Sequence, residues 1–253
     1  MTISKRLVVT VVLCLFAVAA SAAWERTVSA WDTRLPAQGK VQLSLWGDYW
    51  ASEAAGADAT TLNGTLYLTY GIADNWSACV APSFTRWDVD GGDSETGISD
   101  TDVMTTYRFM DEAEAGVDLA VQGRVQIPTG DEDKGLGTGH VEPKLMLLAS
   151  KALGPIIAVA NLGGIAVLDA NDGEEDFILR AELEGIYPLS DQLSLNAVVS
   201  AMTARWDGAD DMVDLGVGAR FTPQEQLFVL GAGYVCFTDA YDWGAQIAAG
   251  FEF

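Results

Sequence analysis

The sequence has little of what enzymes and nucleic-acid-binding proteins usually rely on. Its 253 residues include one histidine and three cysteines, and 14 lysines and arginines stand against 36 acidic residues, for a formal net charge of −22. Because phosphate binding requires a basic surface, we expect no nucleic-acid partner. Cys79 and Cys236, the two cysteines outside the N-terminal segment, are too few for a disulfide scaffold, and we expect them to remain thiols.

Long apolar runs are also missing after the first twenty residues. No later run approaches the roughly 20 residues that a membrane-spanning helix needs. The N-terminus itself has the layout of a secretory signal peptide, because Lys5 and Arg6 precede an apolar run that ends in small residues. We therefore expect a cleaved signal peptide at residues 1–22, a periplasmic leader at 23–37 and one domain at 38–253. The sequence leaves open whether the leader enters that domain.

Strand-like alternation fills this domain. In Val117–Ile127 the apolar residues fall on one face, whereas Asp118, Gln122 and Arg124 fall on the other. About twelve such runs recur, near residues 41–51, 61–71, 76–87, 102–110, 116–128, 141–150, 156–168, 177–187, 193–204, 212–221, 227–237 and 243–253. Short connections alternate with longer acidic ones, such as residues 88–100 and 129–140. This pattern predicts an all-β fold: a transmembrane antiparallel up-and-down barrel with both termini in the periplasm.

A secreted β-sandwich also alternates, but three features disfavour it. The runs are longer than the five or six residues of a typical soluble strand. Aromatic residues gather near the run ends, as in the two interfacial girdles of an outer-membrane barrel: Tyr49, Trp50, Phe84, Trp87, Phe177, Trp206 and Trp243 at the end of the long connections, and Tyr70, Trp76, Tyr107, Phe109, Tyr187 and Phe221 at the other.

The third feature is charge of both signs on the polar face of the runs. A sandwich core would desolvate these side chains at a cost of several kcal/mol each, whereas a wet barrel lumen would not. We predict that they line a pore, which Trp46, Tyr67, Phe228 and Tyr234 narrow. The charged candidates are Arg108, Asp118, Arg124, Glu142, Lys144, Arg180, Glu182, Glu184, Asp214 and Arg220.

The last run ends on Phe253, the final residue. A terminal aromatic on an alternating strand resembles the assembly signal of bacterial outer-membrane proteins, so we predict Phe253 to be an assembly determinant. The expected partners are the barrel-assembly machinery during biogenesis, outer-membrane lipid and lipopolysaccharide, and a small solute. The acidic connections could bind divalent cations or simply be a solvated surface, and the sequence leaves both open.

The most distinctive stretch is the glycine-rich loop, Ile127–His140, which reads IPTGDEDKGLGTGH. Its lysine and glycines do not have the spacing of a phosphate loop, and the strand that follows offers no helix N-terminus for an anion. Residues 124–165, with the PTGD corner, the GLGTG loop, the SK-LG turn and an NLG strand, resemble the meta-pathway phenol-degradation family of outer-membrane barrels. Thr106 stands where that family is expected to have a lysine. The resemblance implies a barrel and uptake of small hydrophobic or aromatic molecules.

Function remains open among three classes. We favour a passive outer-membrane channel or transporter over a non-conducting barrel that displays loops or stiffens the membrane. A hydrolase that uses His140 is the third reading, but Val141 and Glu142 follow this histidine and no nucleophile pairs with it in the sequence. We expect His140 to be a solvated loop residue, and we expect no catalytic activity, no cofactor and no metal ligand among the candidate site residues.

Overall fold

The computed structural model describes residues 26–54 and 57–253, so the expected signal peptide lies outside the described residues. The strands are β1 (Val41–Ala54), β2 (Ala57–Ala73), β3 (Trp76–Ala81), β4 (Ser83–Val89), β5 (Ser94–Ile98), β6 (Thr101–Met110), β7 (Asp118–Ile127), β8 (Glu142–Leu153), β9 (Ile156–Ala166), β10 (Phe177–Pro188), β11 (Leu193–Met202), β12 (Met212–Gln224), β13 (Leu227–Cys236) and β14 (Trp243–Glu252). Two short helical turns, α2 (Glu112–Ala115) and η1 (Glu132–Lys134), interrupt connections. No helix among these residues is long and apolar enough to cross a membrane.

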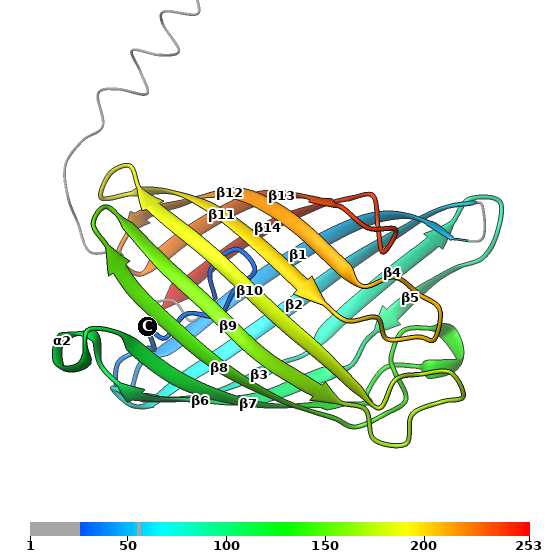
Figure 1. Ribbon diagram of the computed structural model, residues 1–253, viewed down its shortest axis with the longest axis horizontal. Coiled ribbons are helices and arrows are strands. Elements are labelled where there is room, and N and C mark those ends of the chain that lie inside the picture. The colour runs from blue at the N-terminus through cyan, green and yellow to red at the C-terminus, as the bar shows by residue number, and fades with distance from the viewer. Residues whose placement is uncertain (1–25, 55–56) are drawn as a thin grey trace, which may run out of the picture.

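The strands form a closed antiparallel barrel of twelve strands (Figure 1). β3 and β4 act as one strand that breaks at Pro82, because proline has no N–H for the ladder. β5 and β6 likewise continue each other across residues 99–100. The barrel closes where β1 pairs with β14, from Gln42 opposite Glu252 to Ala51 opposite Trp243. The predicted barrel and its twelve runs are confirmed.

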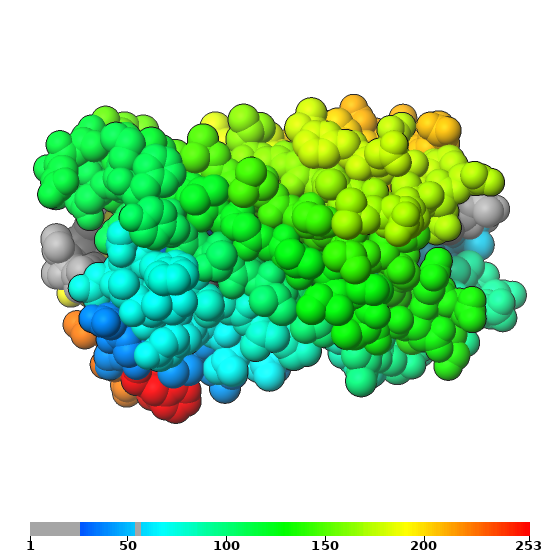
Figure 2. Space-filling model, turned by 90° about the horizontal axis from the view of Figure 1, so that it is seen from below, coloured from blue at the N-terminus to red at the C-terminus, as the bar shows by residue number. Residues whose placement is uncertain are grey.

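The outer wall is lined by exposed apolar side chains. On the face that Figure 2 shows, the strands pack into a continuous surface. Leu45, Leu145, Leu183 and Ile247 point outward and are 60–71% exposed, as lipid-facing residues of an outer-membrane barrel are. The alternate residues of each strand point inward and carry polar and aromatic side chains together with some aliphatic ones, such as Leu148, Val198 and Leu230. All four bulky residues that we expected inside are buried there: Trp46, Tyr67, Phe228 and Tyr234.

Two expectations about strand ends were wrong. Residues 88–100 do not form a loop, because β4 and β5 extend as a hairpin that turns only at Asp90–Asp93, where Gly91 takes a φ of 70°. Trp50 and Trp87 do not belong to the outer girdle. Trp50 packs inward against Tyr234 and Tyr241, and the Trp87 indole donates a hydrogen bond to the Lys134 carbonyl in the glycine-rich loop. The alternation of inward and outward side chains along a strand therefore decides where an aromatic residue lies, even at a strand end.

Five short connections and the C-terminus lie at one end of the barrel (Figure 1). The other end carries the longer connections that follow β7, β9, β11 and β13, together with the short turn between β4 and β5. The five short connections join β2 to β3, β6 to β7, β8 to β9, β10 to β11 and β12 to β13. α2 stands in one of them, capped by the Asp111 side chain, which accepts from the Ala113 N–H at 2.9 Å. Cys79 on β3 and Cys236 on β13 remain thiols.

Phe253 closes the seam of the barrel. Its N–H donates to the Val41 carbonyl at 2.8 Å, and its exposed ring packs on Phe251. We predict that Phe253→Ala lowers the amount of assembled barrel in the outer membrane several-fold. Phe237→Ala is the matched control, because Phe237 is similarly exposed but lies in the β13–β14 connection. Heat-modifiable gel migration of membrane fractions measures the assembled fraction, and equal yields of the two variants would contradict the assembly role.

Candidate functional site: the barrel lumen

Residues 26–37, hereafter the lumenal segment, fold inside the barrel rather than beyond it. The carboxylate of Glu184, on β10, accepts hydrogen bonds from the Thr27 hydroxyl at 2.5 Å, the Val28 N–H at 3.4 Å and the Ala30 N–H at 3.3 Å. The Asn196 amide on β11 donates to the same carboxylate at 2.6 Å. One wall carboxylate therefore binds a whole turn of the segment.

A second anchor lies on β9. The Asn161 side chain accepts from the Trp31 N–H at 2.7 Å and donates to the Trp31 carbonyl at 2.8 Å, as a strand partner would. The Thr33 and Ser150 hydroxyls meet at 2.6 Å. Because these groups are buried, each bond avoids an unsatisfied polar group that would cost about 1–3 kcal/mol.

Arg26 ends the described part of the segment within an aromatic cluster. Its guanidinium carbon lies 4.3 Å from the ring centroid of Trp46, and Nη1 donates to the Tyr67 hydroxyl at 2.6 Å. Trp31 packs edge-on against Tyr67, and Phe228 packs on Trp46. Together these side chains fill the middle of the lumen.

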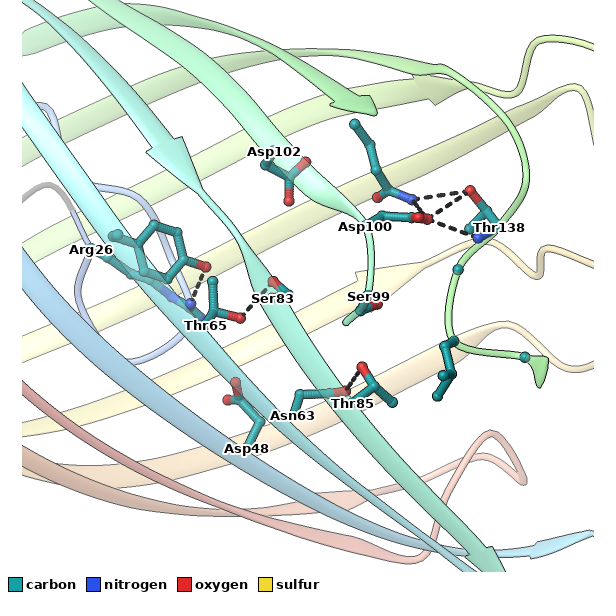
Figure 3. Close-up of a pocket in the computed structure, with 15 residues that line it drawn as sticks. Arg26, Asp48, Asn63, Thr65, Ser83, Thr85, Ser99, Asp100, Asp102 and Thr138 are labelled. Atoms are coloured by element: carbon teal, nitrogen blue, oxygen red, sulfur yellow. Dashed lines mark hydrogen bonds between the residues drawn. The ribbon is translucent and has the colours of Figure 1, made fainter. Parts of the chain in front are cut away.

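Beyond this cluster, toward the long connections, lies a cavity of about 400 Å³, hereafter the vestibule (Figure 3). Most of its lining side chains are polar, and they come from the lumenal segment, β1, β2, β4, β6, β7, the β5–β6 junction and the glycine-rich loop. The lining residues are Arg26, Asp48, Asn63, Thr65, Tyr67, Ser83, Thr85, Ser99, Asp100, Asp102, Gln126, Gly135, Leu136, Gly137 and Thr138.

The glycine-rich loop forms one side of the vestibule. Asp100 holds it, because its carboxylate accepts from the N–H groups of Gly130 at 3.0 Å and Thr138 at 2.8 Å. A side chain at Gly137 would overlap the Asp100 carboxylate, and one at Gly139 would overlap Glu132. The glycines therefore permit close packing inside the barrel mouth, and they place the buried Leu136 against the cavity.

A chain of ion pairs runs from the wall of the vestibule into the long connections. It begins with Arg124, whose Nε donates to Asp102 at 2.6 Å, and continues through Lys144, which lies 3.9 Å from Asp102 and 3.4 Å from Glu142. Arg205 then joins Glu142 at 2.6 Å to Glu174 at 2.9 Å. This ionic chain links β6, β7 and β8 to the β9–β10 and β11–β12 connections.

The ionic chain ends at His140, the histidine of the glycine-rich loop. The Nε2 atom of His140 lies 3.0 Å from the Glu174 carboxylate and 3.1 Å from the Asn171 amide. His140 is 8% exposed, so the expectation of a solvated residue was wrong. Three connections meet around it and shield it from water, a tertiary arrangement that the sequence does not reveal.

The charged residues predicted to line a pore are distributed over the whole lumen, and their role in solute passage stays a prediction. Arg124 and Lys144 belong to the ionic chain beside the vestibule, as does Glu142. Glu182 and Glu184 bind the lumenal segment, and Arg180 pairs with Glu182 at 2.6 Å. Arg220 donates to the Arg26 carbonyl and Asp214 accepts from Tyr241, whereas Asp118 and Arg108 bind the turn that holds α2.

Several site residues were not named from the sequence: Asp48, Asn63, Asp100, Asp102 and Asn161. Asp48, Asn63, Asp102 and Asn161 have inward parity on their strands, and that signal could have identified them. Asp100 lies at a strand break, where parity gives no guidance.

A closed barrel with an apolar exterior, a polar lumen and connections of unequal length defines the class of outer-membrane β-barrel proteins. The chain belongs to the family described as "Putative MetA-pathway of phenol degradation", which it matches over residues 48–252. No functionally curated protein matches it in sequence.

Solved structures share this fold. An outer-membrane channel from Pseudomonas putida F1 has a TM-score of 0.75 at 16% identity, covering 90% of this chain and 100% of that one. The NanC porin matches with a TM-score of 0.56 at 9% identity, over 83% of this chain and 98% of that one. The translocator domain of the autotransporter NalP from Neisseria meningitidis also matches, with a TM-score of 0.53 at 14% identity, over 85% of this chain and 88% of that one. Because channels and a translocator share the architecture, the fold alone does not assign the function.

The pKa of Glu174 gives the ionic chain a pH dependence. Burial disfavours the charged carboxylate, but the Asn171 N–H, Arg205 and His140 outweigh it and lower the pKa below the usual value of 4.5. The stabilisation is therefore present above about pH 4.5 and is lost as pH falls through the lowered pKa. We predict that Glu174→Gln lowers the melting temperature at pH 7 by about 2–4 °C and that the difference vanishes in acid.

Glu175→Gln is the matched control, since only the backbone of Glu175 has a hydrogen bond to this cluster, to the Arg205 carbonyl. Circular dichroism melts of folded protein in detergent between pH 3 and pH 8 measure both. A difference between wild type and Glu174→Gln that persists unchanged at pH 3 would contradict the role of the carboxylate.

The glycines of the loop give a second prediction. Gly137→Ala should displace the loop from Asp100, at a cost of about 1–3 kcal/mol, because the added methyl group has no space. Gly123→Ala on β7 is the control, since a side chain there meets open space. Limited proteolysis of folded protein should cut the loop faster in Gly137→Ala only. Equal cleavage would show that the loop does not need the close contact.

Proposed function

We propose that this protein is an outer-membrane channel through which small solutes pass without an energy source. The observation that carries the proposal is the vestibule: a cavity of about 400 Å³ inside a closed barrel, lined by polar side chains and large enough for a single-ring solute. The apolar outer wall and the aromatic residues at both of its ends support insertion in the outer membrane of a Gram-negative bacterium.

The orientation follows the usual rule for such barrels. The short connections and the C-terminus face the periplasm, and the long acidic connections face outward, next to lipopolysaccharide. The vestibule then opens toward the cell exterior, and the lumenal segment lies on its periplasmic side. The description of the family supports a small aromatic or hydrophobic solute.

The lumenal segment favours one alternative, a non-conducting barrel, because it fills the lumen beside the Arg26 cluster. Passage through the centre requires the segment to move or to leave a narrow path along the wall. Measurement of ion conductance separates the two functions directly. A hydrolytic function has less support, since the Nε2 of His140 faces Glu174 and Asn171, which leaves this atom no open path to a nucleophile.

Weakening the anchor of the lumenal segment should therefore open the channel. Glu184→Gln keeps the size of the side chain but turns one acceptor into a donor at a point where four donors converge. The lost hydrogen bonds, about 1–3 kcal/mol, should raise the open probability in planar bilayers by roughly tenfold. Glu225→Gln is the control, because Glu225 is exposed in the β12–β13 turn.

Solute entry into proteoliposomes should rise in parallel with the conductance of Glu184→Gln. If wild type and both variants conduct no ions and admit no solute, although heat-modifiable migration shows them folded, the protein is a non-conducting barrel. Equal conductance of wild type and Glu184→Gln would show instead that ions bypass the lumenal segment.

A further inference from the structure

One wall of the vestibule presents donors and acceptors in register across three strands. Asp48 on β1 lies opposite Asn63 on β2, and Asn63 lies opposite Thr85 on β4. The next inward-facing residue of β2 after Asn63 is Thr65, which lies opposite Ser83 on β4. Directly opposed side chains on neighbouring strands have Cβ atoms about 4.5–5.5 Å apart, so the functional groups of each row lie next to one another.

The hydrogen bonds of this wall leave specific groups open to the cavity. Gln246 donates to one oxygen of the Asp48 carboxylate at 2.6 Å, and the other oxygen has no hydrogen bond to any residue that the structure describes. Asn63 accepts from the Thr85 hydroxyl at 2.8 Å through its oxygen, and its amide hydrogens have no acceptor among residues 26–54 and 57–253. Asp48 is 9% exposed, so this polarity is directed into the vestibule and not into bulk water.

The Asp48 oxygen and the Asn63 amide hydrogens, which lack hydrogen-bond partners among the described residues, can together bind one kind of functional group in a ligand. Two hydroxyls on adjacent carbons can satisfy both, because one donates to the carboxylate and its neighbour accepts from the amide. We propose that Asp48 and Asn63 form a binding site for small neutral molecules with two adjacent hydroxyl groups. The inference rests on the proposed function and gives its vestibule a solute class.

The surroundings fit this ligand. The Thr65 and Ser83 hydroxyls, which bond each other at 3.0 Å, extend the polar wall for a further hydroxyl (Figure 3). Leu136 lies on the loop side of the cavity, where it can contact a carbon skeleton. The Arg26 guanidinium donates a hydrogen bond to Tyr67 and stacks on Trp46. Three acidic residues, Asp48, Asp100 and Asp102, line the cavity. An anion would meet these carboxylates, so a neutral diol is favoured.

The adjacent hydroxyls could belong to an aromatic ring or to a saturated polyol, and the test separates these sources. Isothermal titration of the folded full chain in detergent compares benzene-1,2-diol with benzene-1,3-diol and phenol in one arm. The other arm compares cyclohexane-1,2-diol and glucose with cyclohexanol. We expect the 1,2-diol of at least one arm to bind at least about tenfold more tightly than its single-hydroxyl counterpart, since one charged hydrogen bond contributes that much.

Two variants test the residues themselves. Asp48→Asn keeps the acceptor for Gln246 but replaces the open carboxylate oxygen by a donor, and Asn63→Asp keeps the acceptor for Thr85 but removes the amide hydrogens. Each should reduce the affinity for the preferred 1,2-diol about tenfold and leave the affinity for the single-hydroxyl compound nearly unchanged. Asp90→Asn, in the exposed turn between β4 and β5, should bind like wild type.

Equal affinities for the 1,2-diols, the 1,3-diol and the single-hydroxyl compounds would overturn the proposal. So would a preference for 1,2-diols that survives in both folded variants. Ion conductance of the same preparations keeps the two hypotheses apart. Conductance without a diol preference refutes the binding site alone, whereas a diol preference without conductance or solute flux refutes the channel alone.

Discussion

The carboxylate of Glu184 connects the barrel wall to the chain segment that fills it. The apolar exterior forces polar side chains inward, and the lumen of a twelve-stranded barrel lies between one filled by side chains and one filled by water. Inward charges therefore need partners within the protein. Glu184 finds them in the Thr27 hydroxyl, the N–H groups of Val28 and Ala30, and the Asn196 amide. Without the lumenal segment this carboxylate would lose three of its donors, so the wall and the segment stabilise each other.

The lumen consequently has two halves with different properties. The half next to the short connections is packed with the lumenal segment and the aromatic cluster around Arg26, whereas the half next to the long connections contains the vestibule. The ionic chain crosses strands from Arg124 to His140 and joins the wall of the vestibule to three connections at the barrel mouth. The barrel mouth and the cavity wall are therefore joined by directly bonded charges.

Alternation of polar and apolar residues was enough to predict the strands, the inward parity of Trp46 and Glu184, and the lipid-facing wall, because a barrel separates the two environments residue by residue. Trp50 and Trp87 were assigned wrongly because their position near strand ends was used, although alternation points both of them inward. The lumenal segment could not be predicted, since it has no periodicity and its bond from Thr27 to Glu184 spans 157 residues. The open groups of the vestibule follow from strand register, which the sequence of one strand does not contain.

The central claim is that the lumenal segment occupies the lumen of the assembled protein. The contact between the Thr33 and Ser150 hydroxyls, 2.6 Å apart, allows a direct measurement. With Cys79 and Cys236 replaced by serine, a Thr33→Cys, Ser150→Cys pair should form an intramolecular disulfide in outer membranes, because sulfur atoms in place of these two oxygens lie within a small adjustment of the roughly 2 Å S–S bond length. We predict nearly complete cross-linking in the folded barrel, measured by mass spectrometry of peptides before and after reduction. A folded barrel in which both thiols stay reduced and react with a membrane-permeant maleimide would contradict the account.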